Sequence, residues 1–520
     1  MYEKVVYNWN RRIRSIPKQV FVPSTVEEVQ EIVRKANIDH TEVRVIGTTH
    51  SLSDIIQTNG YLIRTDKFKK MEVVDANNYL VKIQTGVSIK EMDGFLQRHN
   101  MVLGTGTAFD YPTIGGVIAA GCHGTGKDYS IISDLVVAMT VVDGLGEIRI
   151  FNSEAELKYA RCTLGLLGII IDVTLQAEPA SNVRATGVDR LLSEVVTATE
   201  LKKLFDDNDS LELYTFPFSP NIFIKTTNAV SSQQSNFSLF KLYMGSFFTV
   251  VFAHMASPLM QRFPGIVYKL GSGGAKLFGP YDDVRSKRYA IHYASGDQYG
   301  PKTINPEYAV PFNNDLVSWQ RMAEAIKALL ELNDRYYKEK GQVPCVFGYN
   351  IRFTRSTTCV LSPANFSGLT RSTSFIEDGL SSSTTELSTS ISLLTDDPSN
   401  SLSAAAATTA AVAAAVVAAD VATDRGAKYV MWVNVLLGPN ARGQEEFHQD
   451  VYKLITSQPF YGLPHWPKDW YSIPTTNAAK YADFMKFRAR SGVDPNNIFI
   501  NGPLLRVFNT ASKSECGVAV

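Results

Sequence analysis

A short loop rich in glycine and hydroxyl side chains, residues 45–54, carries a single histidine near its tip. Its sequence, VIGTTHSLSD, overlaps residues 42–46, whose alternating polar and apolar side chains predict a strand. Backbone N–H groups in such a loop can converge on phosphate oxygens, and its hydroxyl groups add donors. The loop therefore fits either a phosphate-binding turn that presents His50 or an ordinary turn around a hydrogen-bonded histidine.

A second segment, residues 112–126, reads PTIGGVIAAGCHGTG. Its glycines and alanines surround a short apolar run, a composition that suits a backbone approached closely by a flat ligand or a pyrophosphate. No lysine follows the glycines, which excludes a P-loop. No G-x-G-x-x-G lies between a strand and a helix, which argues against a Rossmann dinucleotide site. The segment thus indicates close backbone contact with a ligand outside those two motif classes.

Capped helices and short strands must position these two segments. Thr25 and Glu28 have the spacing of a capping box, as do Ser88 and Glu91, and apolar residues follow each pair at helical intervals. Strands are predicted over residues 80–84, 136–142, 148–151, 169–175 and 429–436. The second and third of these flank an Asp-Gly turn and should pair as a hairpin. Strands and helices mixed with hairpins predict an α+β fold.

Length and composition bound the class of protein. The 520 residues predict two to four domains, and 51 Lys and Arg against 51 Asp and Glu give no reason to expect a nucleic-acid partner. The 27 Phe and 23 Tyr exclude a wholly disordered chain. Five cysteines without zinc or disulfide spacing favour a reducing compartment. The N-terminus lacks the apolar core of a secretory signal, so we expect a cytoplasmic or membrane-associated protein.

Two segments interrupt an aromatic-rich second domain that begins at about residue 180. Residues 242–261 have about the length of a membrane span but contain His254, Pro258 and other polar residues. They fit a buried domain helix, an interfacial helix that gives peripheral membrane association, or a span. Residues 368–428 are first Ser/Thr-rich and then Ala-rich. We expect the first part to be a flexible insert, and the second could form a helix.

The ordered motifs together resemble one family. The first third contains PSTVEEVQEIV, VIGTTHSLSD, TIGGVIAAGCHGTG and GLLGIIIDVTL, and the last third contains IRFTR followed by LSP, then PHWPK and DPNNIFIN. This order resembles the vanillyl-alcohol oxidase (PCMH-type) superfamily of FAD-linked oxidases. Within it, the chain is similar to the sugar-1,4-lactone and alditol oxidases. The resemblance covers nearly the whole chain except residues 368–428, and it is weaker in the middle.

The resemblance implies an architecture and a cofactor. A PCMH-type FAD-binding domain of two α+β subdomains should span about residues 10–180. An α+β substrate or cap domain should follow over about 181–450, with the insert at 368–428, and residues 451–520 should complete the active site. His50 falls where the family attaches FAD covalently, the alternative being a non-covalent contact. Cys122 is expected to pack rather than to form a second flavin link.

The resemblance also assigns cofactor contacts, residue by residue. Those expected at the pyrophosphate are Gly47, Thr48, Thr49 and Ser51. Those expected on the other side of the cofactor are Thr113, Gly116, Gly121, His123, Gly124 and Thr125. The adenine end should meet Ile169 or Ile170. No metal is expected.

On the substrate side, oxidising an alcohol with flavin requires a group that accepts the hydroxyl proton and cations that stabilise negative charge. The resemblance implies Arg352, His465 and Lys468, where Arg352 could instead be structural and Lys468 a surface ion pair. Trp466 is expected to pack. The chain departs from the family at Asn350, where a glutamate is usual, and an amide cannot take a proton at neutral pH. Proton removal then falls to His465, Lys468 or water, or the substrate differs.

The activity these expectations favour is an FAD-dependent oxidation of a CH–OH group of a sugar lactone or polyol. Hydride would pass to flavin N5, and O2 would become H2O2. With a gulono- or galactonolactone the product would be an ascorbate-type compound. Two alternatives remain open: a dehydrogenase that passes electrons to a cytochrome or quinone, and a catalytically impaired flavin-binding protein.

Overall fold

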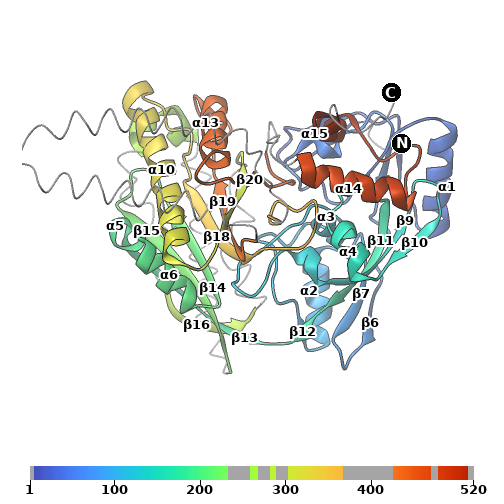
Figure 1. Cartoon of the computed structure of the whole chain (residues 1–520), viewed down its shortest axis with the longest axis horizontal. Helices are drawn as coiled ribbons and strands as arrows, with labels where there is room; N and C mark the ends of the chain where they lie inside the picture. The colour runs from blue at the N-terminus through green and yellow to red at the C-terminus, as the bar shows by residue number, and fades with distance from the viewer. Residues whose placement is uncertain are drawn as a thin grey trace, which may run out of the picture.

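The computed structural model describes residues 5–231, 258–267, 281–288, 302–366, 426–469 and 478–512. Two lobes lie side by side (Figure 1), and both C-terminal helices pack on the N-terminal lobe. Nearly all of the insert at 368–428 lies outside the described residues, as do residues 242–257 of the segment considered as a membrane element. Among the described residues, no helix is both long and apolar enough to cross a bilayer.

A small parallel sheet in the N-terminal lobe carries the first loop. Its order is β3-β5-β4, formed by Gln19–Phe21, Tyr61–Arg64 and Val43–Ile46. Helix α1, Val26–Ile38, connects β3 to β4, and its N-cap Thr25 accepts a hydrogen bond from the Glu28 N–H as predicted. The buried face of α1 packs with Val43 and Tyr61. The loop at residues 47–51 therefore starts from the end of β4, an edge strand that this packing holds in place.

An antiparallel sheet of five strands forms the rest of this lobe. Its order is β10-β9-β11-β7-β6, formed by Ile148–Phe151, Val136–Val142, Ile169–Gln176, Leu80–Gln84 and Met71–Asp75. The predicted hairpin β9–β10 and the capping box of α2, Ile89–Arg98, are both confirmed. Helices α3 (Ile114–Ala119) and α4 (Glu154–Ala160) pack nearby. Short elements complete the lobe: Val6–Tyr7 (β1), Arg14–Ser15 (β2), Met101–Val102 (β8), Glu178–Pro179 (β12), Asp54–Ile56 (η1) and Ile132–Leu135 (η2).

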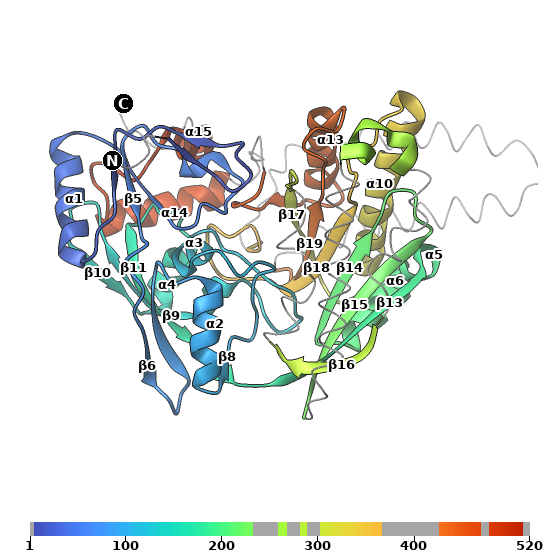
Figure 2. The same ribbon diagram turned by 180° about the vertical axis from the view of Figure 1, so that it is seen from behind.

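The second lobe is built on an antiparallel sheet with the order β16-β13-β15-β14-β18-β19-β17-β20. In that order its strands are Tyr281–Lys287, Asn182–Leu191, Asn221–Val230, Ser210–Thr215, Tyr349–Arg355, Tyr429–Val435, Glu307–Phe312 and Leu463–Pro464. Helices cover one face of this sheet, among them α5 (Leu192–Val195), α6 (Ala198–Asp206), α10 (Leu316–Lys340) and α13 (Gln444–Thr456). They lie on the side of the sheet away from the N-terminal lobe (Figure 2).

Alternation along the central strands decides which side chains meet the N-terminal lobe. Ile351 and Phe353 of β18 belong to the apolar cluster under the helices. Because neighbouring side chains of a strand point to opposite faces, Asn350 and Arg352 point toward the N-terminal lobe. The same rule places Glu307 of β17 and Trp432 of β19 on that face, since Tyr308 and Val433 lie in the helix-side cluster.

The C-terminal segment returns to the first lobe. Helices α14, Ala478–Ser491, and α15, Gly502–Ser512, lie on it in both views (Figures 1 and 2). The Val43 N–H donates to the Ile498 carbonyl at 2.7 Å, and the Asn501 amide donates to the Ile55 carbonyl at 2.9 Å. Residues near the end of the chain thus brace the strand that carries the first loop.

Candidate active site and cofactor cavity

A deep cavity lies between the two lobes, with about 1560 Å³ of empty space that includes open solvent. Both glycine-rich segments found in the sequence line it, together with side chains from the sheet of the second lobe. Most of the predicted site residues line it: Gly47, Thr48, Thr49, His50, Ser51, Thr113, Gly116, His123, Ile169, Ile170, Arg352, His465 and Lys468. The cavity therefore brings together motifs more than 400 residues apart in the sequence.

The loop after β4 turns tightly at one wall of this cavity. A methyl group at Gly47 would lie 2.0 Å from Thr113 Oγ1, so only glycine allows the two segments to meet. Thr49 has a φ of 55°, in the left-handed region. His50 lies between two aromatic rings, with centroid distances of 5.2 Å to Trp9 and 5.0 Å to Phe109. The loop thus holds one imidazole at a fixed place in the wall.

The charge of His50 suits a nucleophile rather than a cation. Burial, reinforced by the positive charge of Lys468, lowers the pKa of His50 to about 4. At neutral pH the ring is uncharged, and one nitrogen keeps its lone pair. This state is compatible with the covalent flavin link expected at this position.

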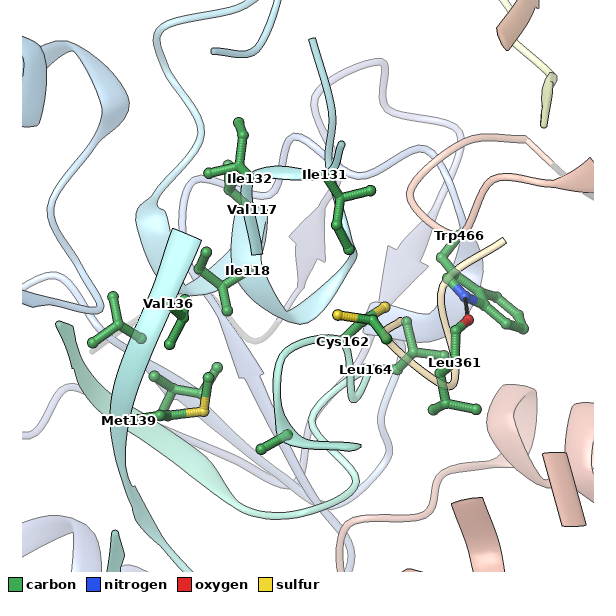
Figure 3. Close-up of a cluster of buried hydrophobic side chains, with 14 of the residues drawn as sticks. Val117, Ile118, Ile131, Ile132, Val136, Met139, Cys162, Leu164, Leu361 and Trp466 are labelled. Atoms are coloured by element: carbon green, nitrogen blue, oxygen red, sulfur yellow. Dashed lines mark hydrogen bonds between the residues drawn. The ribbon is translucent and has the colours of Figure 1, made fainter. Parts of the chain in front are cut away.

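The turn at 464–468 brings His465 and Lys468 against the same loop. The Leu52 N–H donates to the Pro467 carbonyl at 2.7 Å, and the His465 N–H donates to the Glu307 carbonyl at 2.8 Å. Trp466, between them, is buried and donates to the Leu361 carbonyl at 2.7 Å, packed beside the apolar cluster of the first lobe (Figure 3). The contacts of Trp466 are those of a packing residue, as expected.

Glu307, which sequence reasoning missed, is the carboxylate at the centre of the site. Its side chain is only 1% exposed. Oε1 lies 2.6 Å from Arg352 Nη2, and Oε2 lies 3.0 Å from His465 Nδ1 and 3.5 Å from Lys468 Nζ. A charged residue at the start of the apolar strand EYAVPF was the available signal. Three predicted residues thus converge on an unpredicted one.

The charge balance at Glu307 favours an ionised carboxylate and a net positive site. Burial opposes ionisation, but Lys468, Arg352 and His123 outweigh it and hold the pKa of Glu307 well below its ordinary value. Burial lowers the pKa of both nearby histidines, His123 to about 3. With neutral imidazoles, two cations face one carboxylate. The excess charge is available to an anion in the cavity.

His465 is arranged to accept a proton. Its Nδ1 lies beside the Glu307 carboxylate, and its Nε2 lies 3.3 Å from the Gly121 carbonyl. In the tautomer that carries its proton on Nδ1, Nε2 keeps a lone pair. A proton taken up at Nε2 would meet that carbonyl oxygen. This is the geometry of an imidazole oriented and stabilised by a buried carboxylate.

His123 stacks on Trp432, with the rings 3.6 Å apart and 10° from parallel. Its Nδ1 lies 2.9 Å from the Gly124 carbonyl, and its Nε2 lies 3.5 Å from Glu307. Ligand atoms of His123, Glu307 and His465 all lie within 4.8 Å of one another, as a metal site requires. However, Arg352 and Lys468 already bind the same carboxylate, and their charges oppose a cation there.

Asn350, where the related family has glutamate, lies on the same sheet face as the central carboxylate. In the strand register Asn350 pairs with Asn434, and Asn434 pairs with Glu307. Asn350 is buried, its Nδ2 has no partner among the described residues, and it does not line the cavity. The carboxylate at the cavity therefore comes from β17.

Arg44 provides a test of whether the cavity fits FAD. This buried guanidinium lines the cavity and donates to the Phe499 carbonyl at 3.2 Å and the Leu164 carbonyl at 2.9 Å. Its Nε has no partner among the described residues, and burial lowers its pKa to about 10. A buried cation with a free donor suits a dinucleotide that carries phosphates and ring acceptors. Together with the close backbone approach at Gly47, the residues present fit FAD.

Three predicted cofactor residues lie elsewhere. The Gly121 carbonyl faces His465, the Gly124 carbonyl faces His123, and the Thr125 hydroxyl donates to the Leu211 carbonyl at 3.0 Å. None of the three lines the large cavity. Cys122 does line it, and burial raises the pKa of its thiol to about 12. A protonated thiol is a poor nucleophile, in line with its expected packing role.

Comparison with known families agrees with this geometry. Residues 17–152 match an FAD binding domain, and residues 173–507 match the D-arabinono-1,4-lactone oxidase family. L-gulonolactone oxidase from Bos taurus is 30% identical over 365 residues, which are 68% of this chain and 78% of that protein. L-gulono-1,4-lactone dehydrogenase from Mycobacterium tuberculosis is 23% identical over 357 residues, which are 69% of this chain and 79% of that one.

Solved structures support the fold. A cholesterol oxidase from B. sterolicum superposes with a TM-score of 0.72 at 16% identity, and the match covers 97% of this chain and 96% of that one. A chitooligosaccharide oxidase gives a TM-score of 0.59 at 11% identity, covering 96% and 93% of the two chains. The predicted α+β architecture with a PCMH-type FAD domain is thus confirmed.

Proposed function

The chain belongs to the D-arabinono-1,4-lactone oxidase family, and on that premise we propose that it oxidises a CH–OH group of a sugar 1,4-lactone and passes the electrons to O2. It is an FAD-dependent oxidoreductase. The observation that carries the assignment is the convergence of Arg352, His465 and Lys468 on buried Glu307 at the wall of the FAD cavity.

Bound FAD supplies a two-electron acceptor for the hydride of the reacting carbon. The cofactor would be held by the loop at 47–51, by Thr113 and Gly116, by Ile169 and Ile170, and by Arg44, all of which line the cavity. We propose that His50 forms a covalent link to the flavin. Its neutral ring, fixed between Trp9 and Phe109, supports that proposal.

Residues of the second lobe would bind the substrate and remove its hydroxyl proton. His465 accepts the hydroxyl proton at Nε2 while Glu307 holds its Nδ1 proton and stays ionised. Arg352 and Lys468 stabilise the negative charge that develops on the substrate oxygen. Asn305 also lines the cavity, and its buried Oδ1 lacks a partner among the described residues, so it can accept a hydrogen bond from a sugar hydroxyl. These roles require no glutamate at position 350.

A lactone panel tests the substrate and the acceptor together. We expect L-gulono-1,4-lactone or D-arabinono-1,4-lactone to drive O2 consumption with equal formation of H2O2, and alditols to be poorer. Reduction of cytochrome c under turnover without O2 uptake would instead favour a dehydrogenase, the activity named for the mycobacterial relative.

The four cysteines within the described residues are free thiols, which supports a reducing compartment.

A further inference from the structure

A second cavity, with about 1010 Å³ of empty space that includes open solvent, lies between the lobes, next to the catalytic end of the first. In three pairs of nearby residues, one member lines the second cavity and the other lines the first. Thr105 lines the second and Thr107 the first, and Thr125 lines the second and His123 the first. Glu212 of β14 lines the second cavity, and its register partner on β18 is Arg352, which lines the first. The two spaces therefore adjoin at the reacting groups.

The wall of the second cavity includes one buried hydroxyl that has no hydrogen-bond partner among the described residues. Thr105 is 5% exposed, and its Oγ1 has no hydrogen-bond partner among the described residues. A buried hydroxyl without a partner is unfavourable unless a ligand or water completes it. Carboxylates add acceptors around it: Asp93, Asp128, Asp209 and Glu212. The space is large enough to hold one sugar ring in place of several water molecules.

The charges of the wall decide what kind of ligand fits. Lys225 lies 2.9 Å from Glu212, with the two side chains 8% and 13% exposed, and Arg288 donates to the Gly104 carbonyl at 2.6 Å. Both cations are thus engaged, which disfavours an anionic ligand. The carboxylates do not converge on one point, because within the described ranges the one group with metal-site geometry is that around Glu307. A neutral ligand with many hydroxyl groups can donate hydrogen bonds to the carboxylate oxygens of this wall and complete the Thr105 hydroxyl.

We propose that the second cavity is an outer subsite that binds a neutral, hydroxyl-rich extension of the substrate, such as a glycosyl unit carried on the lactone. The proposal rests on the lactone oxidation proposed above. A hydroxyl bound at Glu212 lies beside the strand position of Arg352, which interacts electrostatically with both Glu212 and Glu307. A ligand bound in the outer subsite therefore changes the electrostatic environment of the reacting alcohol through Arg352.

The test compares a hexono-1,4-lactone with the same lactone carrying glucose on O6, using FAD-loaded enzyme. Thr105→Val removes the unpartnered hydroxyl with little change of shape. Thr215→Val is the matched control, because the Thr215 hydroxyl is also buried and unpartnered in the described structure but lines neither cavity. Asp128→Asn changes an exposed acceptor of the same wall without risk to the core.

We expect the wild-type enzyme to oxidise the glucosylated lactone at least as efficiently as the plain one. Thr105→Val should lower kcat/KM about fivefold for the glucosylated lactone alone, the loss of one hydrogen bond, and Thr215→Val should change neither. A wild-type enzyme that oxidises only the plain lactone, or an equal loss for both substrates in Thr105→Val, would overturn the subsite.

Equilibrium binding separates this proposal from the activity. In calorimetric titrations of enzyme whose flavin has been reduced beforehand with dithionite, so that no hydride can be transferred, the glucosylated lactone should bind wild type about fivefold more tightly than Thr105→Val. Equal affinities would refute the subsite even if both lactones are oxidised. Failure of both lactones to be oxidised, with the binding difference intact, would refute the proposed reaction alone.

Discussion

The Nδ1 atom of His465 lies 3.0 Å from Oε2 of Glu307, and both side chains are almost completely buried. Glu307 begins β17, and His465 follows β20, the strand that pairs with β17 at the edge of the sheet. The pair is therefore fixed by backbone pairing as well as by its own hydrogen bond. Arg352, two strands away from β17, reaches the other oxygen of the same carboxylate.

Glu307→Gln should nearly abolish oxidation while the enzyme keeps its FAD. The amide preserves the shape but removes the charge that orients His465 and balances Arg352 and Lys468. We expect kcat/KM to fall about 100-fold or more, the scale of a lost acid–base contribution. Steady-state kinetics at equal flavin content measure this. Glu178→Gln, at a carboxylate bound by Tyr129 outside the large cavity, is the control and should stay near wild type.

The pH dependence should report His465. Burial lowers its pKa below 6.5, although Glu307 offsets part of that effect. The neutral ring is the proton acceptor, so activity should be full at neutral pH and fall as the pH drops through the lowered pKa. In His465→Gln we expect a much lower kcat and no acid limb from this group. An unchanged acid limb in the variant would assign proton removal to another group.

Arg44→Met should impair cofactor loading. The change removes the buried donor at Nε and leaves the carbonyls of Leu164 and Phe499 without their partner, a loss of about 1–3 kcal/mol for each unsatisfied group. We expect a lower flavin-to-protein ratio and a smaller rise of Tm when FAD is added. Arg161→Met removes another buried arginine, which binds the Val136 carbonyl and does not line the cavity. That control should lose stability but load FAD normally.

Asn305→Ala should raise KM. Its Oδ1 is buried and unpartnered in the described structure, so truncation removes no side-chain hydrogen bond at that atom in the free enzyme. If the oxygen accepts a substrate hydroxyl, KM should rise about fivefold. Asn333→Ala offers the comparison, since Asn333 is also buried and lines neither cavity. A KM shift in both variants would point to a general loosening instead.

His50→Ala should separate covalent from non-covalent flavin. Wild-type protein precipitated with acid should keep its yellow colour in the pellet, and flavin fluorescence should stay with the band on a denaturing gel. The variant should release any bound flavin to the supernatant. Release of flavin from the wild type as well would leave His50 with a contact role only.

Local patterns predicted much of the first lobe because its signals are short-range. Capping residues and helical periodicity located α1 and α2, and an Asp-Gly turn located the hairpin β9–β10. The loop at 47–51 and the segment around Thr113 were found for the same reason. Their composition by itself signals close backbone approach.

The contacts that give Glu307 and Arg44 their roles could not be found this way. Glu307 matters because the pairing of β17 with β19 and β20 brings its carboxylate into contact with Arg352 and His465, which are 45 and 158 positions away in the sequence. Arg44 matters because its partners are carbonyls 120 and 455 positions away. Contacts between residues so far apart produce no pattern in the local sequence. For the same reason Thr125, grouped with the cofactor loop by sequence, lines the second cavity instead.

Anaerobic stopped-flow spectroscopy of the purified enzyme tests the central claim most directly. Mixing with L-gulono-1,4-lactone or D-arabinono-1,4-lactone should bleach the flavin absorbance of the wild type and do so far more slowly in Glu307→Gln. A flavin that dithionite bleaches but no sugar lactone does, or equal bleaching rates in the two proteins, would contradict the account.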